Sequence, residues 1–248
     1  VWVTPAQWSF PLPLPLPLLG IRPAGVLGES GERPEWEAEL PFETLLADGV
    51  GVGPAVETTF YHRASGSLLV TDAVQWIPST PPPVVDKDLL LRVAADDPSD
   101  APLPDTPENR AAGWAKTCLL VSFFGPDHQT RAPGGGLELV WEDGWQDSFG
   151  AISEKLVVSP VVRYLVFGKN PAAVERWLSA VEERFAGTRR IIPAHFEVVE
   201  AGVGELREAF AFLRDPKDPS LNPLPPKDIA TIQSLNAALE AAGIANAA

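Results

Sequence analysis

The sequence is poor in the residues that build cross-links and metal centres: its 248 residues include one cysteine, three histidines and no methionine. The single cysteine, Cys118, excludes an internal disulfide and a cysteine-rich zinc site. It begins an apolar run that ends at Phe124, so we predict a buried, unreactive thiol. Because methionine is absent, we expect a chain that starts at Val1 to be processed or to be a fragment of a longer protein.

Long hydrophobic runs are also missing. The best candidate, residues 156–167, contains Arg163 and is too short, since a membrane-spanning helix needs about 20 apolar residues. Residues 10–19 are apolar, but proline recurs at every second position up to Pro17. Proline removes backbone donors and clashes with the preceding helical turn, so we expect an extended polyproline-like segment there. The sequence therefore predicts no transmembrane segment and no secretory signal.

Positive charge is scarce relative to negative charge. Nineteen Lys and Arg residues face 33 Asp and Glu residues, which gives a net charge of −14. Such a chain repels phosphate groups, so we expect no nucleic-acid partner. A hydrophobic content of 45% is enough to bury a real core.

A β-hairpin is the clearest strand signal. Residues 56–61 and 67–72 are rich in β-branched, aromatic and apolar residues, and residues 64–66 supply a turn. The second strand is apolar on both faces, which is typical of the interior of a sheet. The turn predicts that Asp72 lies opposite Thr58 or Thr59, so His62 would be roughly 10–13 Å from Asp72. We therefore do not expect a His62–Asp72 dyad.

Helices are predicted by caps and by apolar residues at steps of three and four. The strongest pattern follows Asn170 and Pro171, which suit a helix start. Its apolar face consists of Val174, Trp177, Leu178, Val181 and Phe185. Further helices are expected over residues 114–124, 149–158, 203–213 and 229–239, the last ending near Gly243. Extended or loop segments are expected over residues 1–48, 78–113 and 134–145, and a strand over 189–193.

Two candidate site residues follow predicted strands. Asp72 comes after the second hairpin strand, and His195 comes after the strand at 189–193. Ligands gather at the carboxyl ends of strands in α/β proteins, so we expect these two side chains to meet at one rim. His62 and His128 are interpreted as structural or solvated. The glycine run at 49–54 ends in proline and precedes a strand, which excludes a dinucleotide loop.

Several segments together resemble the DUF4336 family of plants, algae and cyanobacteria. They keep the same order from residue 1 to about residue 213. The segments are residues 3–20 (VTPAQWSFPLPLPLPLLG), 60–63 (FYHR) with 68–74 (LLVTDAV), 113–114 (GW), 156–160 (LVVSP) and 189–196 (RRIIPAHF).

The resemblance implies an α/β fold of the metallo-β-lactamase-like αββα sandwich type, or only its C-terminal half, with a Pro-rich N-terminal segment. Residues 1–248 would form a single domain. By resemblance, Asp72 matches the aspartate that bridges metals, and His195 matches the last histidine of the metal site. The histidine expected within residues 53–58 is missing, and the first ligand cluster would precede Val1.

Asp72 and His195 are therefore predicted to be vestigial metal ligands that persist as a hydrogen-bonded core pair. No cofactor is expected, and zinc, manganese or iron would require ligands from an upstream half. A half fold would also leave an unpaired sheet edge and exposed apolar faces, which another chain or a further segment of the protein must cover.

The resemblance thus favours a non-catalytic accessory, assembly or scaffolding subunit of a larger plastid complex. Photosynthetic complexes and peripheral association with a membrane complex are included in this prediction. The alternative is a metal-dependent hydrolase of the metallo-β-lactamase superfamily with its remaining ligands upstream of Val1. A flavodiiron-type oxidoreductase is a third option and needs the same missing ligands.

Overall fold

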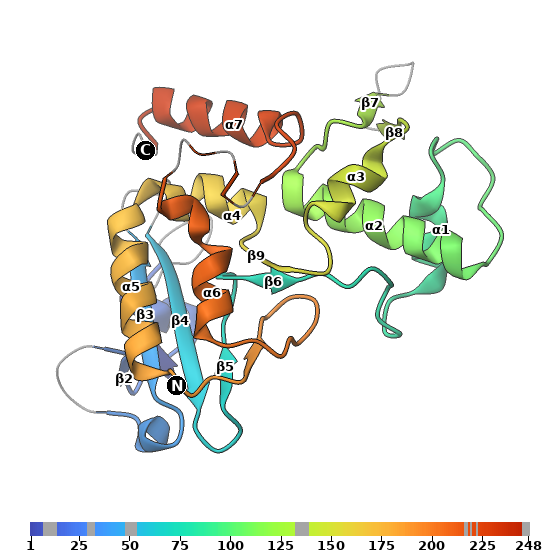
Figure 1. Cartoon of the computed structure of the whole chain (residues 1–248). Coiled ribbons are helices and arrows are strands. Elements are labelled where there is room, and N and C mark those ends of the chain that lie inside the picture. The colour runs from blue at the N-terminus through green and yellow to red at the C-terminus, as the bar shows by residue number, and fades with distance from the viewer. Residues whose placement is uncertain are drawn as a thin grey trace.

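The computed structural model describes residues 1–6, 14–28, 33–47, 54–131, 139–215, 218, 220–221 and 223–244. Helices and short strands alternate along the chain, so the predicted α/β class is confirmed (Figure 1). In the part of the chain that is described, no helix is long and apolar enough to cross a membrane. The glycine run at 49–53 lies outside the described residues.

The largest sheet has four strands in the order β10-β5-β4-β3. Their bounds are Phe42–Ala47 for β3, Ala55–His62 for β4, Ser67–Leu69 for β5 and Arg190–Ile192 for β10. Neighbouring strands β3, β4 and β5 are antiparallel, whereas β10 runs parallel to β5. The predicted hairpin and the interior position of its second strand are confirmed.

The hairpin register differs slightly from the prediction. Phe60 pairs with Leu69, and continuing this pairing brings Glu57, rather than Thr58 or Thr59, opposite Asp72. The strand also ends at Leu69, three residues before Asp72. The turn causes this difference. Strand pairing begins with His62 opposite Ser67, which shifts the alignment of the two strands by one residue from the predicted one.

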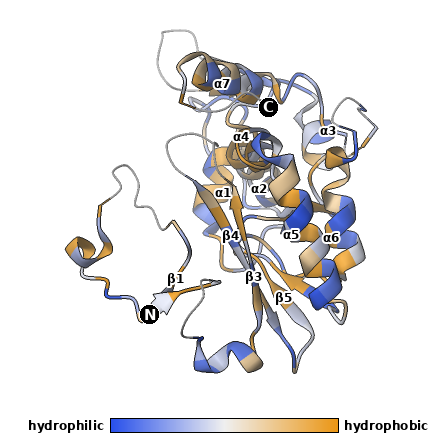
Figure 2. Ribbon diagram, turned by 90° about the vertical axis from the view of Figure 1, so that its left-hand side faces the viewer, coloured by the Kyte–Doolittle hydropathy of each residue, from blue (hydrophilic) through white to orange (hydrophobic). Residues whose placement is uncertain are grey.

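Helices α5 (Pro171–Arg184) and α6 (Val203–Ala209) cover one face of this sheet (Figure 2). The Asn170 side chain caps α5 by accepting a hydrogen bond of 3.1 Å from the backbone N–H of Ala173. All five predicted apolar residues of this helix are buried. With the sheet they form the first cluster, which includes Leu45, Tyr61, Leu68, Val74, Val174, Trp177, Leu178, Val181, Phe185, Ile191, Leu206 and Phe210.

The N-terminal segment lies on the other side of the sheet (Figure 2). It contains the paired strands β1 (Trp2–Val3) and β2 (Gly25–Val26) and the 3-10 helices η1 (Leu16–Leu19) and η2 (Glu35–Ala38). The Trp36 ring contacts Phe42 and Phe60, with centroids 6.2 and 5.9 Å apart. Helix η1 corrects the prediction of a wholly extended proline segment, because proline tolerates the first turn of a helix. Residues 7–13 of that segment lie outside the described residues.

A second cluster of buried residues forms around helices α1 (Lys87–Ala94), α2 (Pro107–Phe123) and α3 (Trp145–Gly150). Helix α1 corrects the prediction of an irregular loop over 78–113. The Asp86 side chain caps it by accepting from the backbone N–H groups of Asp88 and Leu89. Helix α2 confirms the buried helix and starts earlier than predicted, because Thr106 supplies a cap. Strands β7 (Gln129–Arg131) and β8 (Leu139–Trp141) pair beside it, so the loop predicted over 134–145 is partly a strand.

Two short strands and a helix lie between the clusters. Strand β6 (Gln75–Trp76) pairs with β9 (Leu156–Val157), and α4 (Pro160–Leu165) follows, then the short 3-10 helix η3 (Phe167–Lys169). The helix predicted over 149–158 is therefore wrong, because residues 156–157 pair with β6 as a strand instead.

The C-terminal predictions are confirmed by α6, the 3-10 helix η4 (Ala211–Leu213) and α7 (Ala230–Ala241), after which Gly243 adopts a φ of 67°.

Candidate functional site

Asp72 and His195 meet at one rim of the four-stranded sheet. The His195 Nε2 atom lies 3.2 Å from Asp72 Oδ1. Strands β5 and β10 are parallel neighbours, so the residues beyond their carboxyl ends come together. The backbone N–H of Ala194 donates to the carbonyl of Thr71 at 3.3 Å and holds the two segments together. The predicted meeting of these side chains is confirmed.

The pair is not a core pair, however, which corrects the prediction. The side chains of His195 and Asp72 are 67% and 59% exposed. Both residues lie three residues beyond the ends of their strands, β5 at Leu69 and β10 at Ile192. Water surrounds such exposed groups and weakens their interaction, so the pair contributes little to stability.

A buried carboxylate lies next to this rim. Glu57 is 4% exposed and accepts hydrogen bonds from Thr71 N–H at 2.7 Å, from the Thr71 hydroxyl and from Asp72 N–H at 3.1 Å. Burial raises the pKa of Glu57, and the hydrogen bonds from Thr71 and Asp72 oppose that shift. Glu57 therefore holds the turn that carries Asp72.

Sequence reasoning missed Glu57. The only signal was an acidic residue inside a strand of β-branched and aromatic residues, directly opposite Asp72 in the corrected register. Glu57 falls within residues 53–58, where the resemblance led us to expect a histidine.

The donor set does not fit a resident metal ion. Across the described ranges, no group of three or more His, Cys, Asp or Glu side chains is placed to hold one. Asp72 and His195 supply two donors, whereas zinc sites use three or four protein ligands. The Glu57 oxygens are already bonded to the backbone and hydroxyl of the 71–72 turn.

The other histidines and the cysteine have different environments. His62 Nδ1 lies 2.7 Å from the Ser65 hydroxyl and its Nε2 lies 3.4 Å from Glu39, so it belongs to the hairpin turn, as expected. His128 is half-buried rather than solvated. Cys118 is a free, buried thiol, and burial raises its pKa, which keeps the reactive thiolate scarce.

A cavity of about 600 Å³ opens beside the Asp72–His195 rim, between the first and second clusters. Its apolar walls include Val74 from the first cluster, and Trp114 and Phe196 from the second. The Trp114 and Phe196 rings meet edge to face, with centroids 5.8 Å apart. The site is therefore apolar inside and polar at its rim.

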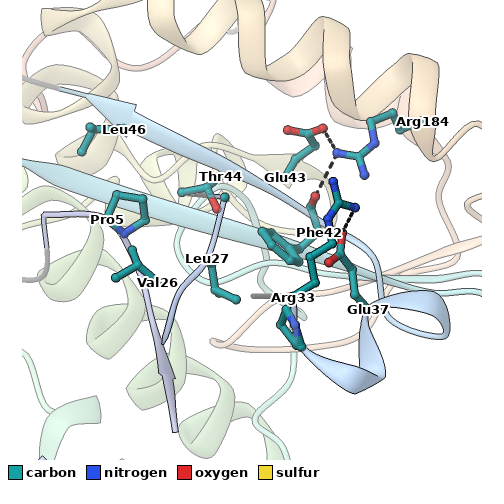
Figure 3. A pocket seen from close by; sticks show the side chains of 12 residues that line it. Pro5, Val26, Leu27, Arg33, Glu37, Phe42, Glu43, Thr44, Leu46 and Arg184 are labelled. Atoms are coloured by element: carbon teal, nitrogen blue, oxygen red, sulfur yellow. Dashed lines mark hydrogen bonds and ion pairs between the residues drawn. The ribbon is translucent and has the colours of Figure 1, made fainter. Parts of the chain in front are cut away.

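A second cavity, of about 510 Å³, lies beside the outer strand β3 (Figure 3). The N-terminal segment contributes Pro5, Val26 and Leu27, and β3 contributes residues from both of its faces. At one end, Arg184 pairs with Glu43 and also donates to the carbonyl of Phe42 at 3.1 Å. At the same end, Arg33 pairs with Glu37 at 3.1 Å.

Comparison with known proteins identifies one family. The family model described as "Domain of unknown function (DUF4336)" matches residues 1–212. No curated protein and no solved structure matches the chain.

Proposed function

Since the chain belongs to the DUF4336 family, we propose that it is a non-catalytic accessory or assembly subunit that docks onto a larger protein complex. The observation that carries this proposal is the outer edge of β3. In the described ranges, no strand pairs with that edge. An unpaired edge is a template for adding a strand from another chain.

The backbone of β3 shows which groups face outward. The Tyr61 N–H donates to the Pro41 carbonyl at 2.8 Å, so odd-numbered positions of β3 bond to β4. The even-numbered positions, Phe42, Thr44 and Leu46, turn their backbone groups to the outside. Arg184 reaches the Phe42 carbonyl from that side. The backbone groups of Thr44 and Leu46 are then the ones that an added strand would meet.

The cavity of Figure 3 gives such a strand a place to bind. It runs along β3, and Pro5, Val26 and Leu27 form its far wall. An extended partner segment would bond to Thr44 and Leu46 and bury its alternate side chains against this wall. Each hydrogen bond would add about 0.5–1.5 kcal/mol, and apolar contact would supply the rest.

The finer fold and location are part of the proposal. A metallo-β-lactamase-like αββα sandwich, or its C-terminal half, is supported by the helical layer of α5 and α6 on one sheet face. A second β layer would then come from outside the described residues or from a partner. The family resemblance favours a plastid complex, with photosynthetic complexes as one class.

One observation favours the alternative, a metal-dependent hydrolase. Asp72 and His195 lie 3.2 Å apart at the ends of two parallel strands, where metal ligands could converge. This function needs further ligands from beyond the described residues.

Metal analysis of the full-length natural protein separates the two functions. The docking proposal expects no stoichiometric zinc, manganese or iron. Stoichiometric metal that is lost in both Asp72→Ala and His195→Ala would overturn it.

The docking edge is tested by Thr44→Pro with Thr44→Val as the matched control. Proline removes the outward N–H and blocks pairing, yet is tolerated on an edge strand; valine keeps the backbone donor. Tagged proteins would be purified from the source cells and sized. Wild type and Thr44→Val should elute in a complex larger than the 26.6 kDa chain, and Thr44→Pro should elute alone. Equal elution of all three proteins, as monomers or as complexes, would refute the docking role of β3.

A further inference from the structure

We infer that the groove between helices α2 and α4 is a second docking surface, which receives an amphipathic helix with basic side chains along its border from a partner protein. The groove is the cavity of about 600 Å³ beside the Asp72–His195 rim, where α2 and α4 contact each other. It shares no lining residue with the cavity along β3. Failure of docking at one surface therefore leaves docking at the other untouched.

The outer face of α2 carries an apolar stripe. Trp114, Val121 and Phe124 follow one another at steps of seven and three residues, so they share one side of the helix over about 15 Å. Trp114 is buried in the wall of the groove, whereas Val121 and Phe124 are 60% and 55% exposed. Val84 lines the same groove and is 90% exposed. Large apolar side chains that gather on a surface in this way mark an interaction site.

The walls of the groove favour a helix over an extended partner segment. Side chains of α2 and of the start of α4, which supplies Val161 and Val162, form its sides. Helix α2 bonds its own backbone groups as far as Leu120, whose carbonyl accepts from the Phe124 N–H at 3.1 Å, so it offers no ladder to an extended chain. An extended segment would leave its own backbone groups unpaired against this stripe, whereas a helix bonds them internally. The stripe spans about three helical turns, which suits apolar anchors at steps of three, four and seven.

The border of the groove favours basic side chains on the partner. Asp72 and Glu197 both line it, and none of its described lining residues is Lys or Arg. His195 adds at most one positive charge, so the border is negative whether or not this imidazole is protonated. The net charge of −14 acts in the same direction. Complementary charges at such a rim orient the partner, and burial of the apolar stripe supplies the affinity.

Two labelled model peptides of about 14 residues test this surface. Both carry leucine at helical steps of three and four, and their polar positions are lysine in one peptide and glutamate in the other. Fluorescence anisotropy measures their binding to the purified chain. We expect the lysine peptide to bind with saturation and the glutamate peptide to bind at least about tenfold more weakly. Equal binding of the two peptides, or no saturable binding of the lysine peptide, would overturn the inference.

Double variants of equal net charge separate the border from the overall charge of the chain. Asp72→Asn combined with Glu197→Gln should weaken binding of the lysine peptide by about three- to tenfold. Asp143→Asn combined with Glu183→Gln removes two exposed carboxylates outside the groove and should change binding by less than about twofold. Equal losses in both double variants would show that only the net charge acts and would refute the assigned border.

Single variants test the apolar stripe. Val84→Gln and Val121→Gln should each weaken binding of the lysine peptide by about fivefold, because less apolar surface is buried. Both positions are exposed, so the melting temperature should stay that of the wild type. Leu18→Gln is the control, since Leu18 is 73% exposed in η1 and lies outside the groove; its binding should be unchanged. Unchanged binding in both valine variants would refute the assigned site.

Other occupants of the groove give different results. We expect the purified chain alone to sediment as a monomer and not to bind vesicles that contain phosphatidylserine. A wild-type dimer that Val121→Gln dissociates would assign the groove to a second copy of the chain. Vesicle binding that Val121→Gln abolishes would assign it to a membrane surface. Either result would overturn the inferred partner.

Discussion

Lys116 places an ammonium group inside the second cluster and is fully buried. Its Nζ donates to the carbonyls of Ala94 and Ala95 at 2.6 and 3.0 Å, and to Asp96 at 2.6 Å. These carbonyls end helix α1, so the cation compensates the negative end of that helix. One side chain thus joins α2 to the end of α1.

Replacing Lys116 by methionine should lower the free energy of unfolding by about 3 kcal/mol, because two carbonyls lose their buried partner. Chemical denaturation of both proteins measures the change. Lys87→Met is the control, since Lys87 is 62% exposed and lies 3.7 Å from Asp105; its loss should cost under about 1 kcal/mol. Equal effects of the two changes would show that burial of Lys116 is not important.

Glu57 should make stability depend on pH. Its pKa is raised above the ordinary 4.5 in the folded chain, so the folded state holds the proton more tightly than the unfolded state. This contribution to stability is complete below the ordinary pKa and is lost as pH rises through the folded pKa. Unfolding of wild type and Glu57→Gln, from about pH 4 to about pH 7, should show that the variant lacks this loss. Parallel pH profiles would contradict the prediction.

At the scale of elements, helices α1 and α2 approach closely because position 113 is glycine. A Cβ atom added to Gly113 would overlap the backbone carbonyl of Leu90 in α1. Gly113→Ala should therefore destabilise the protein by about 2 kcal/mol, because overpacking outweighs the helix propensity of alanine. In α6, a Cβ at Gly204 meets no atom within 4 Å, so Gly204→Ala should leave the melting temperature unchanged or raise it. Similar losses in both variants would contradict this explanation.

Over the whole molecule, the rim with its apolar cavity lies in one region and the free edge of β3 lies in another. The cavity lies between the clusters, where β6 and α4 join them. The docking edge lies on β3, beside the N-terminal segment (Figures 2 and 3).

Local patterns were enough to predict several elements, because caps, turns and periodic apolar residues act over a few residues. The hairpin, helix α5 with its Asn170 cap and the C-terminal helices followed from such patterns. The same reasoning predicted the meeting of Asp72 and His195, since both follow strands.

Long-range packing decided the rest. The pairing of residues 156–157 with β6 replaced a predicted helix, and the hairpin register placed Glu57 beside Asp72. The apolar cavity arises only where the two clusters meet. Such contacts join residues far apart in the chain, so no local pattern encodes them. The strand pairing, the hairpin register and the cavity are therefore decided by how the helices and strands pack against one another.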